Sequence, residues 1–213
     1  MKKYLILLLV LLKINPVFAQ QLSEKTQVVF DACFKLRTAI ATGNTTGLRS
    51  ANKILKECDV LPFSSLRSID ESPLSLYGHF VFNEDFVDSL IAGRDVYKFA
   101  QRYASPSGVR GTSSNGKVYM KTCVVKGNAS SKYSFKCRGP LQELAVVTEP
   151  GGLVTLRVHD KTNNKWYNDT KKVKKGMESR IVTFELPTET RCVVELEVIN
   201  CGKKDCSFVV ISN

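Results

Sequence analysis

The feature that most constrains the fold of this chain is a period-two alternation of apolar and polar residues in its C-terminal part. It is clearest in three runs, Val154 to Val158, Val182 to Leu186 and Val194 to Val198. Because successive side chains of a β-strand point to opposite faces, each run has one apolar and one polar face. Strands of this kind form antiparallel sheets that cover a core with one face.

Turn signals divide residues 117–213 into eight candidate strands. Gly139-Pro140, Pro150-Gly151-Gly152 and Asn163-Asn164 are among these signals, and their spacing favours a sandwich or jelly roll. The candidate strands are 117–125, 133–137, 143–148, 153–159, 165–168, 180–186, 191–199 and 206–212.

Four segments of this region carry a resemblance to a known type of domain. They are Lys174-Lys175-Gly176-Met177, the strand Val182 to Pro187, the strand Val194 to Asn200, and Ser207-Phe208-Val209-Val210. With the strand order, they resemble the bacterial pre-peptidase C-terminal β-sandwich over less than half of the chain. The resemblance implies an accessory module of a secreted protein, often beside a protease and without catalytic residues of its own. This chain departs from that pattern because it has no recognisable protease region.

The N-terminus has the features of an export signal. Lys2 and Lys3 form a basic end, Leu5 to Leu12 form an apolar run, and Val17-Phe18-Ala19 supplies small residues before a cleavage point. The apolar run is too short to span a bilayer, and no second such run follows. We therefore predict a signal peptide over residues 1–19 and a bacterial protein that is secreted or periplasmic, with no transmembrane segment in the mature chain.

Three helices are predicted in residues 20–104. The first two start near Ser23 and Asn44 and are separated by Gly43, and the third runs from Asn83 to Arg102. Residues 105–116 are rich in glycine and serine and indicate a linker. The predicted fold is therefore α+β, with a helical N-terminal region, this linker, and an eight-stranded antiparallel sandwich or jelly roll over residues 117–213.

The net charge of +11 is unevenly distributed. Residues 20–116 contain 11 basic and 10 acidic side chains, whereas residues 117–213 contain 17 and 10. Such an excess favours anionic partners, and it also fits a lysine-rich solvated surface. Nucleic acid is not predicted as a partner, because few aromatic residues interrupt the basic run and the chain is expected to be exported.

Seven cysteines in an exported chain predict disulfides. If adjacent helices and strands form hairpins, three pairs come together, and Cys192 remains a buried thiol. The predicted bridges are Cys33–Cys58, Cys123–Cys137 and Cys201–Cys206.

The segment from Lys161 to Lys175 is the candidate binding region. An exposed aromatic ring beside amides and carboxylates suits stacking on a sugar, and lysines suit acidic groups of a glycan. The same mixture also fits a polar hairpin whose Trp166 covers the end of the sandwich, and Asp160 with Asp169 is a weak alternative for calcium. The predicted ligand-binding residues are Asp160, Lys165, Trp166, Tyr167, Asn168, Lys171 and Lys172.

The sequence contains no recognisable catalytic set. His79 and His159 are the only histidines, and neither a metalloprotease helix signature nor a Gly-x-Ser-x-Gly elbow occurs. We therefore predict no catalytic residues, no metal site and no cofactor, and a non-catalytic binding protein with an acidic glycan as candidate ligand. The alternative is an accessory subunit that docks a partner protein through the apolar face of the third helix, at Phe86, Leu90 and Tyr97.

Overall fold

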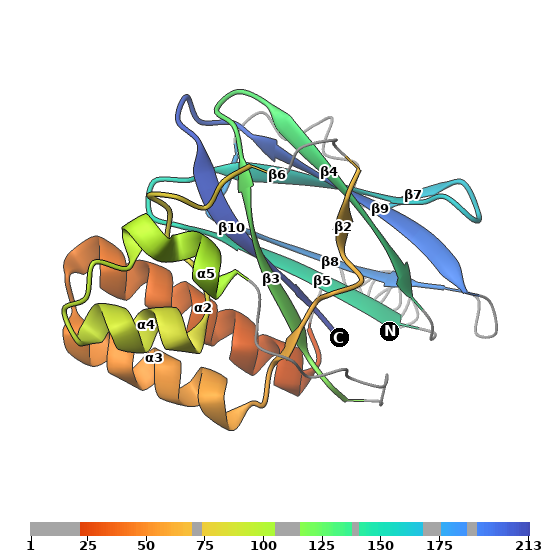
Figure 1. Ribbon diagram of the computed structural model, residues 1–213. Helices are drawn as coiled ribbons and strands as arrows, with labels where there is room; N and C mark the ends of the chain where they lie inside the picture. Colours follow the sequence, from red (N-terminus) through yellow and green to blue (C-terminus); the bar gives the residue numbers. More distant parts are fainter. Residues whose placement is uncertain (1–21, 70–73, 105–115, 138–140, 168–175, 187–190) are drawn as a thin grey trace, which may run out of the picture.

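The fold consists of two five-stranded sheets packed face to face, with helices covering one of them (Figure 1). The computed structural model describes residues 22–69, 74–104, 116–137, 141–167, 176–186 and 191–213. The described part contains four α-helices and ten strands, so the α+β sandwich is confirmed, whereas the predicted numbers of three helices and eight strands are wrong.

Sheet A is the sheet next to the helices. Its strand order is β1-β3-β10-β5-β8. All neighbours in it are antiparallel except the short β1, which runs parallel to β3. Its strands are β1 (Leu61–Pro62), β3 (Tyr119–Val125), β10 (Cys206–Ser212), β5 (Leu141–Thr148) and β8 (Ser179–Glu185).

Sheet B is antiparallel throughout, with the strand order β2-β4-β9-β6-β7. The hairpin of β6 and β7 points away from the helices (Figure 1). The strands are β2 (Arg67–Ser68), β4 (Ser130–Cys137), β9 (Cys192–Asn200), β6 (Val154–Asp160) and β7 (Lys165–Tyr167).

The two sheets differ in sequence pattern because they differ in burial. β10 is buried along its whole length, since Phe208 and Val210 face sheet B while Val209 and Ile211 face the helices. β9 alternates strictly in burial, with Val194 and its even-numbered neighbours inside and the odd-numbered residues, including Glu195 and Glu197, outside. A sheet covered on both faces needs nearly continuous apolar runs, whereas a sheet with one solvent-exposed face needs apolar residues to alternate with polar ones. The outer face of sheet B is therefore the sheet surface of this fold that meets solvent.

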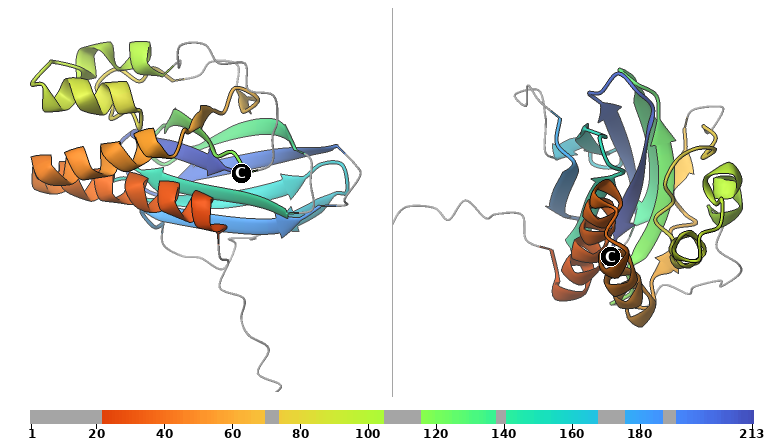
Figure 2. Two further views of the ribbon diagram at one scale, coloured as in Figure 1. Left: turned by 90° about the horizontal axis from the view of Figure 1, so that it is seen from below. Right: turned by 90° about the vertical axis from the view of Figure 1, so that its left-hand side faces the viewer.

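The helices form a layer on sheet A (Figure 2). α2 (Glu24–Thr42) packs on β5 and β10, α3 (Thr45–Glu57) lies against α2, and α4 (Glu84–Ile91) lies against α3. Glu143 of β5 fixes the start of α2, because its two carboxylate oxygens accept hydrogen bonds from the Ser23 backbone N–H (2.6 Å) and hydroxyl (2.7 Å).

The predicted third helix is interrupted. α4 ends at Ile91, and Gly93 follows with a φ of +75°, in the left-handed region that ends helices. A 3₁₀ turn (Tyr97–Phe99) and the short α5 (Ala100–Tyr103) complete the segment. Because α4 and these turns fold back together, Phe86 is buried rather than presented to a partner. Leu90 and Tyr97, the other two residues of the docking face in the accessory-subunit alternative, are partly buried against the same core cluster, so the three side chains do not form an open apolar patch.

None of the three predicted disulfides is present, since none of the seven cysteines takes part in a disulfide. Two of the predictions assumed that β3 and β4, and β9 and β10, form hairpins. The structure instead places β3 and β10 in sheet A, and β4 and β9 in sheet B. Cys123 lies opposite Phe208, and Cys206 lies opposite Val125, so neither faces its predicted partner in a sheet.

The predicted Cys33–Cys58 bridge is absent for a different reason. Cys33 lies on the buried face of α2, and its thiol donates to the Met120 sulfur of β3 at 3.9 Å. Cys58 follows the last residue of α3 and is only partly buried. The two helices do form the predicted hairpin, but Cys33 points toward the sheet rather than toward the neighbouring helix.

Candidate ligand-binding site

The outer face of sheet B brings aromatic and charged side chains from the four adjacent strands β4, β9, β6 and β7 together. The register aligns Lys132, Glu197 and Arg157 in one row. A second row contains Glu195, His159 and Trp166. We call these six residues the Trp166 face, and they line a hollow of about 110 Å³ with Leu196 at its floor.

Trp166 is the dominant feature of this face. It is the only tryptophan of the chain, and 48% of the side chain is exposed. Its ring stacks on the imidazole of His159, with a centroid distance of 4.2 Å and an interplanar angle of 2°. The Arg157 guanidinium lies 5.0 Å from the ring centroid, within the range of a cation–π contact. The indole is thus held in a fixed orientation with nearly half of its surface accessible.

Ion pairs hold the charged groups of the Trp166 face in place. An Arg157 nitrogen donates to a Glu197 oxygen at 3.0 Å, and the Lys161 ammonium lies 3.5 Å from a Glu195 oxygen. His159 shares a hydrogen bond of 3.0 Å between Nε2 and the Asn164 side-chain oxygen. The hollow therefore offers hydrogen-bond donors and acceptors in near charge balance beside a flat ring.

The structure separates the predicted ligand-binding residues from one another. Side chains alternate along β7, so Lys165 and Tyr167 point away from Trp166. Tyr167 covers the edge between the sheets instead, with its ring 4.7 Å from Phe184 and its hydroxyl donating to the Glu185 carbonyl oxygen at 3.1 Å. The Lys165 ammonium lies over the Tyr167 ring at 4.9 Å. Asn168, Lys171 and Lys172 lie outside the described residues.

Asp160 is part of the fold of the β6–β7 turn. It is fully buried, and one carboxylate oxygen accepts from the backbone N–H groups of Thr162 (2.9 Å) and Asn163 (3.2 Å). The other oxygen accepts from the Asn163 side-chain amide at 2.6 Å. These bonds occupy the carboxylate, and Asp169, its partner in the calcium alternative, lies outside the described residues. No cluster of three or more histidine, cysteine or acidic side chains suited to a metal occurs among the residues described.

We expect Asp160→Asn to lower the free energy of unfolding by about 1–2 kcal/mol, because a charge-assisted hydrogen bond in a buried turn is lost. Urea denaturation of the wild type and the variant measures the difference. Asp95→Asn is the matched control, since the Asp95 side chain is 57% exposed and pairs only with Lys98 on the surface. Equal effects of the two substitutions would contradict the structural role of Asp160.

Sequence reasoning missed most of the Trp166 face. The alternating run from Val154 to Val158 predicts a polar face for its strand, and Arg157 and His159 lie on that face beside Trp166. Their proximity to Glu195 and Trp166 depends on the pairing of β6 with β9 and β7. The site could have been found only by combining two things: the polar residues of the alternating strands, and the order of those strands in the sheet.

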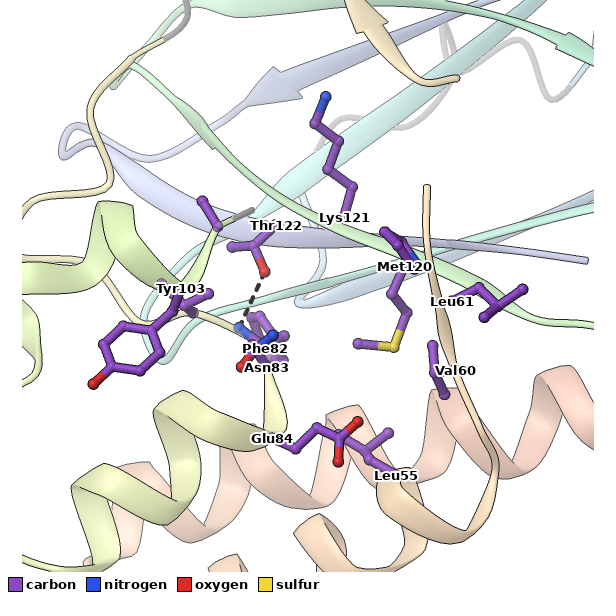
Figure 3. A pocket seen from close by; sticks show the side chains of 13 residues that line it. Leu55, Val60, Leu61, Phe82, Asn83, Glu84, Tyr103, Met120, Lys121 and Thr122 are labelled. Carbon is purple, nitrogen blue, oxygen red and sulfur yellow. Dashed lines mark hydrogen bonds between the residues drawn. The ribbon is translucent and has the colours of Figure 1, made fainter. Parts of the chain in front are cut away.

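A second hollow, of about 90 Å³, lies between the helices and sheet A (Figure 3). Leu55, Val60 and Met120 give it an apolar wall. Its polar groups are largely used within the fold, since the Thr122 hydroxyl accepts from the Phe82 N–H at 3.0 Å, as Figure 3 shows. Burial, followed by the nearby charge of Asp85, raises the pKa of Glu84 at its rim. This hollow has no exposed aromatic platform, so the Trp166 face is the better candidate site.

The described part of the chain is thus a two-sheet β-sandwich with a helical layer on one sheet and the Trp166 face on the other. No protein-family model matches the chain, and no curated protein does. No helix in the described part is long and apolar enough to cross a membrane.

The similar solved structures described below are distant in sequence. The pre-peptidase C-terminal domain of a collagenase from Bacillus anthracis is 15% identical, with a TM-score of 0.31, and the match covers 44% of this chain and 88% of that domain. The type of domain that the sequence was predicted to resemble is thus among the similar solved structures, with 44% of this chain covered.

Two further similar structures are an inhibitor protein and a xylan-binding domain. A periplasmic inhibitor of g-type lysozyme from Salmonella Typhimurium is 15% identical, with a TM-score of 0.31 and coverage of 48% of this chain and 92% of that protein. A CBM22-1 xylan-binding domain from Paenibacillus barcinonensis is 9% identical, with a TM-score of 0.28 and coverage of 47% and 83%. At this distance the similarities carry no argument about the ligand, so the functional case rests on the Trp166 face itself.

Proposed function

We propose that the protein is a non-catalytic binding protein that holds a glycan on the Trp166 face. The observation that carries the proposal is the oriented, half-exposed Trp166 ring beside a hollow lined by Arg157, Glu195 and Glu197. A flat ring can cover the apolar C–H face of a pyranose while charged side chains accept and donate hydrogen bonds at its hydroxyls. The signal peptide predicted for residues 1–19 would place this face outside the cytoplasm.

The contacts of the two carboxylates support a binding role. Glu195 and Glu197 both lie against cationic side chains, Lys161 and Arg157 respectively. We therefore assign both carboxylates to accepting hydrogen bonds from a ligand.

The preference for acidic glycans is a further part of the proposal. Two cations, Lys132 and Arg157, and two carboxylates line the hollow, so the described residues are balanced. The excess of positive charge predicted for this region depends on Lys171 and Lys172, which lie outside the described residues. If those lysines act at the site, affinity for an acidic glycan should fall as salt is raised, because exposed charges are screened.

Because Trp166 is the only tryptophan, intrinsic fluorescence reports directly on the site. We expect at least one oligosaccharide of a panel of neutral and acidic glycans to change the emission saturably. Free N-acetyltryptophanamide titrated with the same sugars is the control for quenching. A panel without any saturable change, and without binding heat in calorimetry, would contradict the proposal.

A further inference from the structure

Cys137 and Cys192 lie directly opposite each other at one end of sheet B. β4 ends at Cys137, β9 begins at Cys192, and the register pairs the two residues. Both face the interior of the sandwich, with 8% and 0% of their surfaces exposed. Residues opposed in an antiparallel pair have Cα atoms about 4.5–5.5 Å apart, which lies within the ~4.4–6.8 Å that a disulfide spans.

The Cys137 thiol is directed toward the strand that carries Cys192. The Cys137 sulfur donates a hydrogen bond to the Cys192 backbone oxygen at 3.7 Å, so it points toward β9. The Cys192 sulfur accepts from the Asn163 side-chain amide at 3.6 Å. Rotation of the Cys192 side chain away from Asn163 would bring the two sulfurs together without a change in strand register.

No other cysteines oppose each other in the strands that the structure describes. Cys123 lies opposite Phe208, and Cys206 lies opposite Val125. Cys201 is exposed and follows the end of β9, with its sulfur 3.6 Å from the Thr155 hydroxyl. The geometry of the sheet therefore distinguishes Cys137 and Cys192 from the remaining thiols.

We propose that Cys137 and Cys192 are a reversible redox pair that exchanges with a low-molecular-weight disulfide such as oxidised glutathione. In the first step, one cysteine thiolate attacks the small disulfide, forms a mixed disulfide and releases one reduced thiol. The second cysteine then attacks the protein sulfur of the mixed disulfide and releases the second reduced thiol. The protein loses two electrons and two protons, and the small disulfide is reduced to two thiols.

The position of the pair explains how exchange can occur in a buried site. Burial, followed by the charges of Cys192 and Asp160, raises the pKa of Cys137 to about 12, and burial with Asp160 also raises the pKa of Cys192. The thiolate is the reacting form, so exchange in the closed sheet should be slow. The pair lies at a strand end, where local opening costs least, so reaction should occur during folding or fraying. Once formed, the bond would tie β4 to β9 at one end of sheet B, and the same local opening would admit a reductant.

The test is equilibration of the reduced, full chain in glutathione buffers of increasing oxidised fraction. The free thiols are then alkylated, and the peptides are analysed by mass spectrometry without reduction. We expect the Cys137–Cys192 peptide to be the main disulfide, and dithiothreitol to reverse it. Oxidation should raise Tm by about 5 °C or more, because a bridge between positions 137 and 192 closes a long loop.

Matched variants distinguish this pair from the exposed thiol. Cys201→Ser should keep the rise in Tm on oxidation, whereas Cys192→Ser and Cys137→Ser should each abolish it. Mass spectrometry of the wild type decides the matter even if one variant fails to fold. The inference is overturned if Cys137 and Cys192 both remain alkylated across the whole series, or if the main disulfide joins another pair.

Discussion

The Phe86→Ala variant should lose about 3–5 kcal/mol of its free energy of unfolding, the cost typical of removing a fully buried phenylalanine. Phe86 is 0% exposed and makes edge-to-face contacts with Phe80, Tyr97 and Tyr103, at centroid distances of 5.1, 5.6 and 5.4 Å. These rings belong to one hydrophobic cluster with Val147 and other residues of sheet A. The cavity would therefore weaken the sandwich as well as the helices.

Urea denaturation followed by circular dichroism at helical and strand wavelengths measures this effect. The control is Phe99→Ala, which removes a ring that is 47% exposed and lies against Arg102, and which should cost less than about 1 kcal/mol. We expect the two wavelengths to report one transition. An early loss of helix with an unchanged strand transition would show that the helical layer and the sandwich unfold independently.

Glu149→Ala should be the second most damaging of these substitutions, at about 3 kcal/mol. One carboxylate oxygen accepts from the Ser207 N–H at 2.6 Å and contacts His79 Nδ1 at 2.7 Å, and the other accepts from the Phe80 N–H at 3.0 Å. This carboxylate links the segment before α4 to β10. Without it, two backbone N–H groups lose their partners inside the protein. Glu57→Ala is the control, because the Glu57 side chain is 62% exposed.

The contact between His79 and Glu149 also predicts how the free energy of unfolding depends on pH. The hydrogen bond to Glu149 raises the pKa of His79 above 6.5 against the opposing effect of burial, with support from the charges of Glu149 and Asp205. Burial alone would raise the pKa of Glu149, but the bonds from His79, Phe80 and Ser207 outweigh it and hold that pKa below 4.5. The His79 contribution is complete below pH 6.5 and is lost as pH rises through its raised pKa. The Glu149 contribution is complete above pH 4.5 and is lost as pH falls through its lowered pKa.

The gap in unfolding free energy between the wild type and Glu149→Gln should therefore be largest between pH 4.5 and 6.5. Denaturation curves of both proteins, recorded at pH values from about 3 to about 9, would measure this gap. The range extends beyond the ordinary pKa values of glutamate and histidine on both sides. A gap that stays constant over this range would mean that the His79–Glu149 pair makes no charge-dependent contribution.

The sequence predicted the strands well and their partners poorly. Alternation identified β6, β8 and β9 nearly to the residue, because period two follows directly from strand geometry. It says nothing about which strands are neighbours. The assumption that consecutive strands pair holds for β6 and β7, yet it fails for β3 with β4 and for β9 with β10, which lie in different sheets. The predicted disulfides of the sandwich failed with that assumption.

The candidate site shows the same limit. Trp166 could be singled out from sequence because it is the only tryptophan of the chain and lies in a polar segment. Tyr167, one residue later, points to the other face of β7 and covers the edge of the sandwich. The charged members of the Trp166 face come from β4, β6 and β9, which are distant in sequence and adjacent only in sheet B. Their grouping is a property of the strand order, which local patterns do not encode.

The most direct test of the account is calorimetric titration with the glycan identified by fluorescence, using the wild type, Trp166→Ala and Tyr77→Ala. Tyr77 is the matched control because its side chain is 64% exposed and lies outside sheet B, in the segment before α4. We expect Trp166→Ala to weaken binding by about tenfold or more, equivalent to about 1.4 kcal/mol, and Tyr77→Ala to bind as the wild type does. Unchanged affinity in Trp166→Ala, or a loss confined to Tyr77→Ala, would contradict the assignment of the site to the Trp166 face.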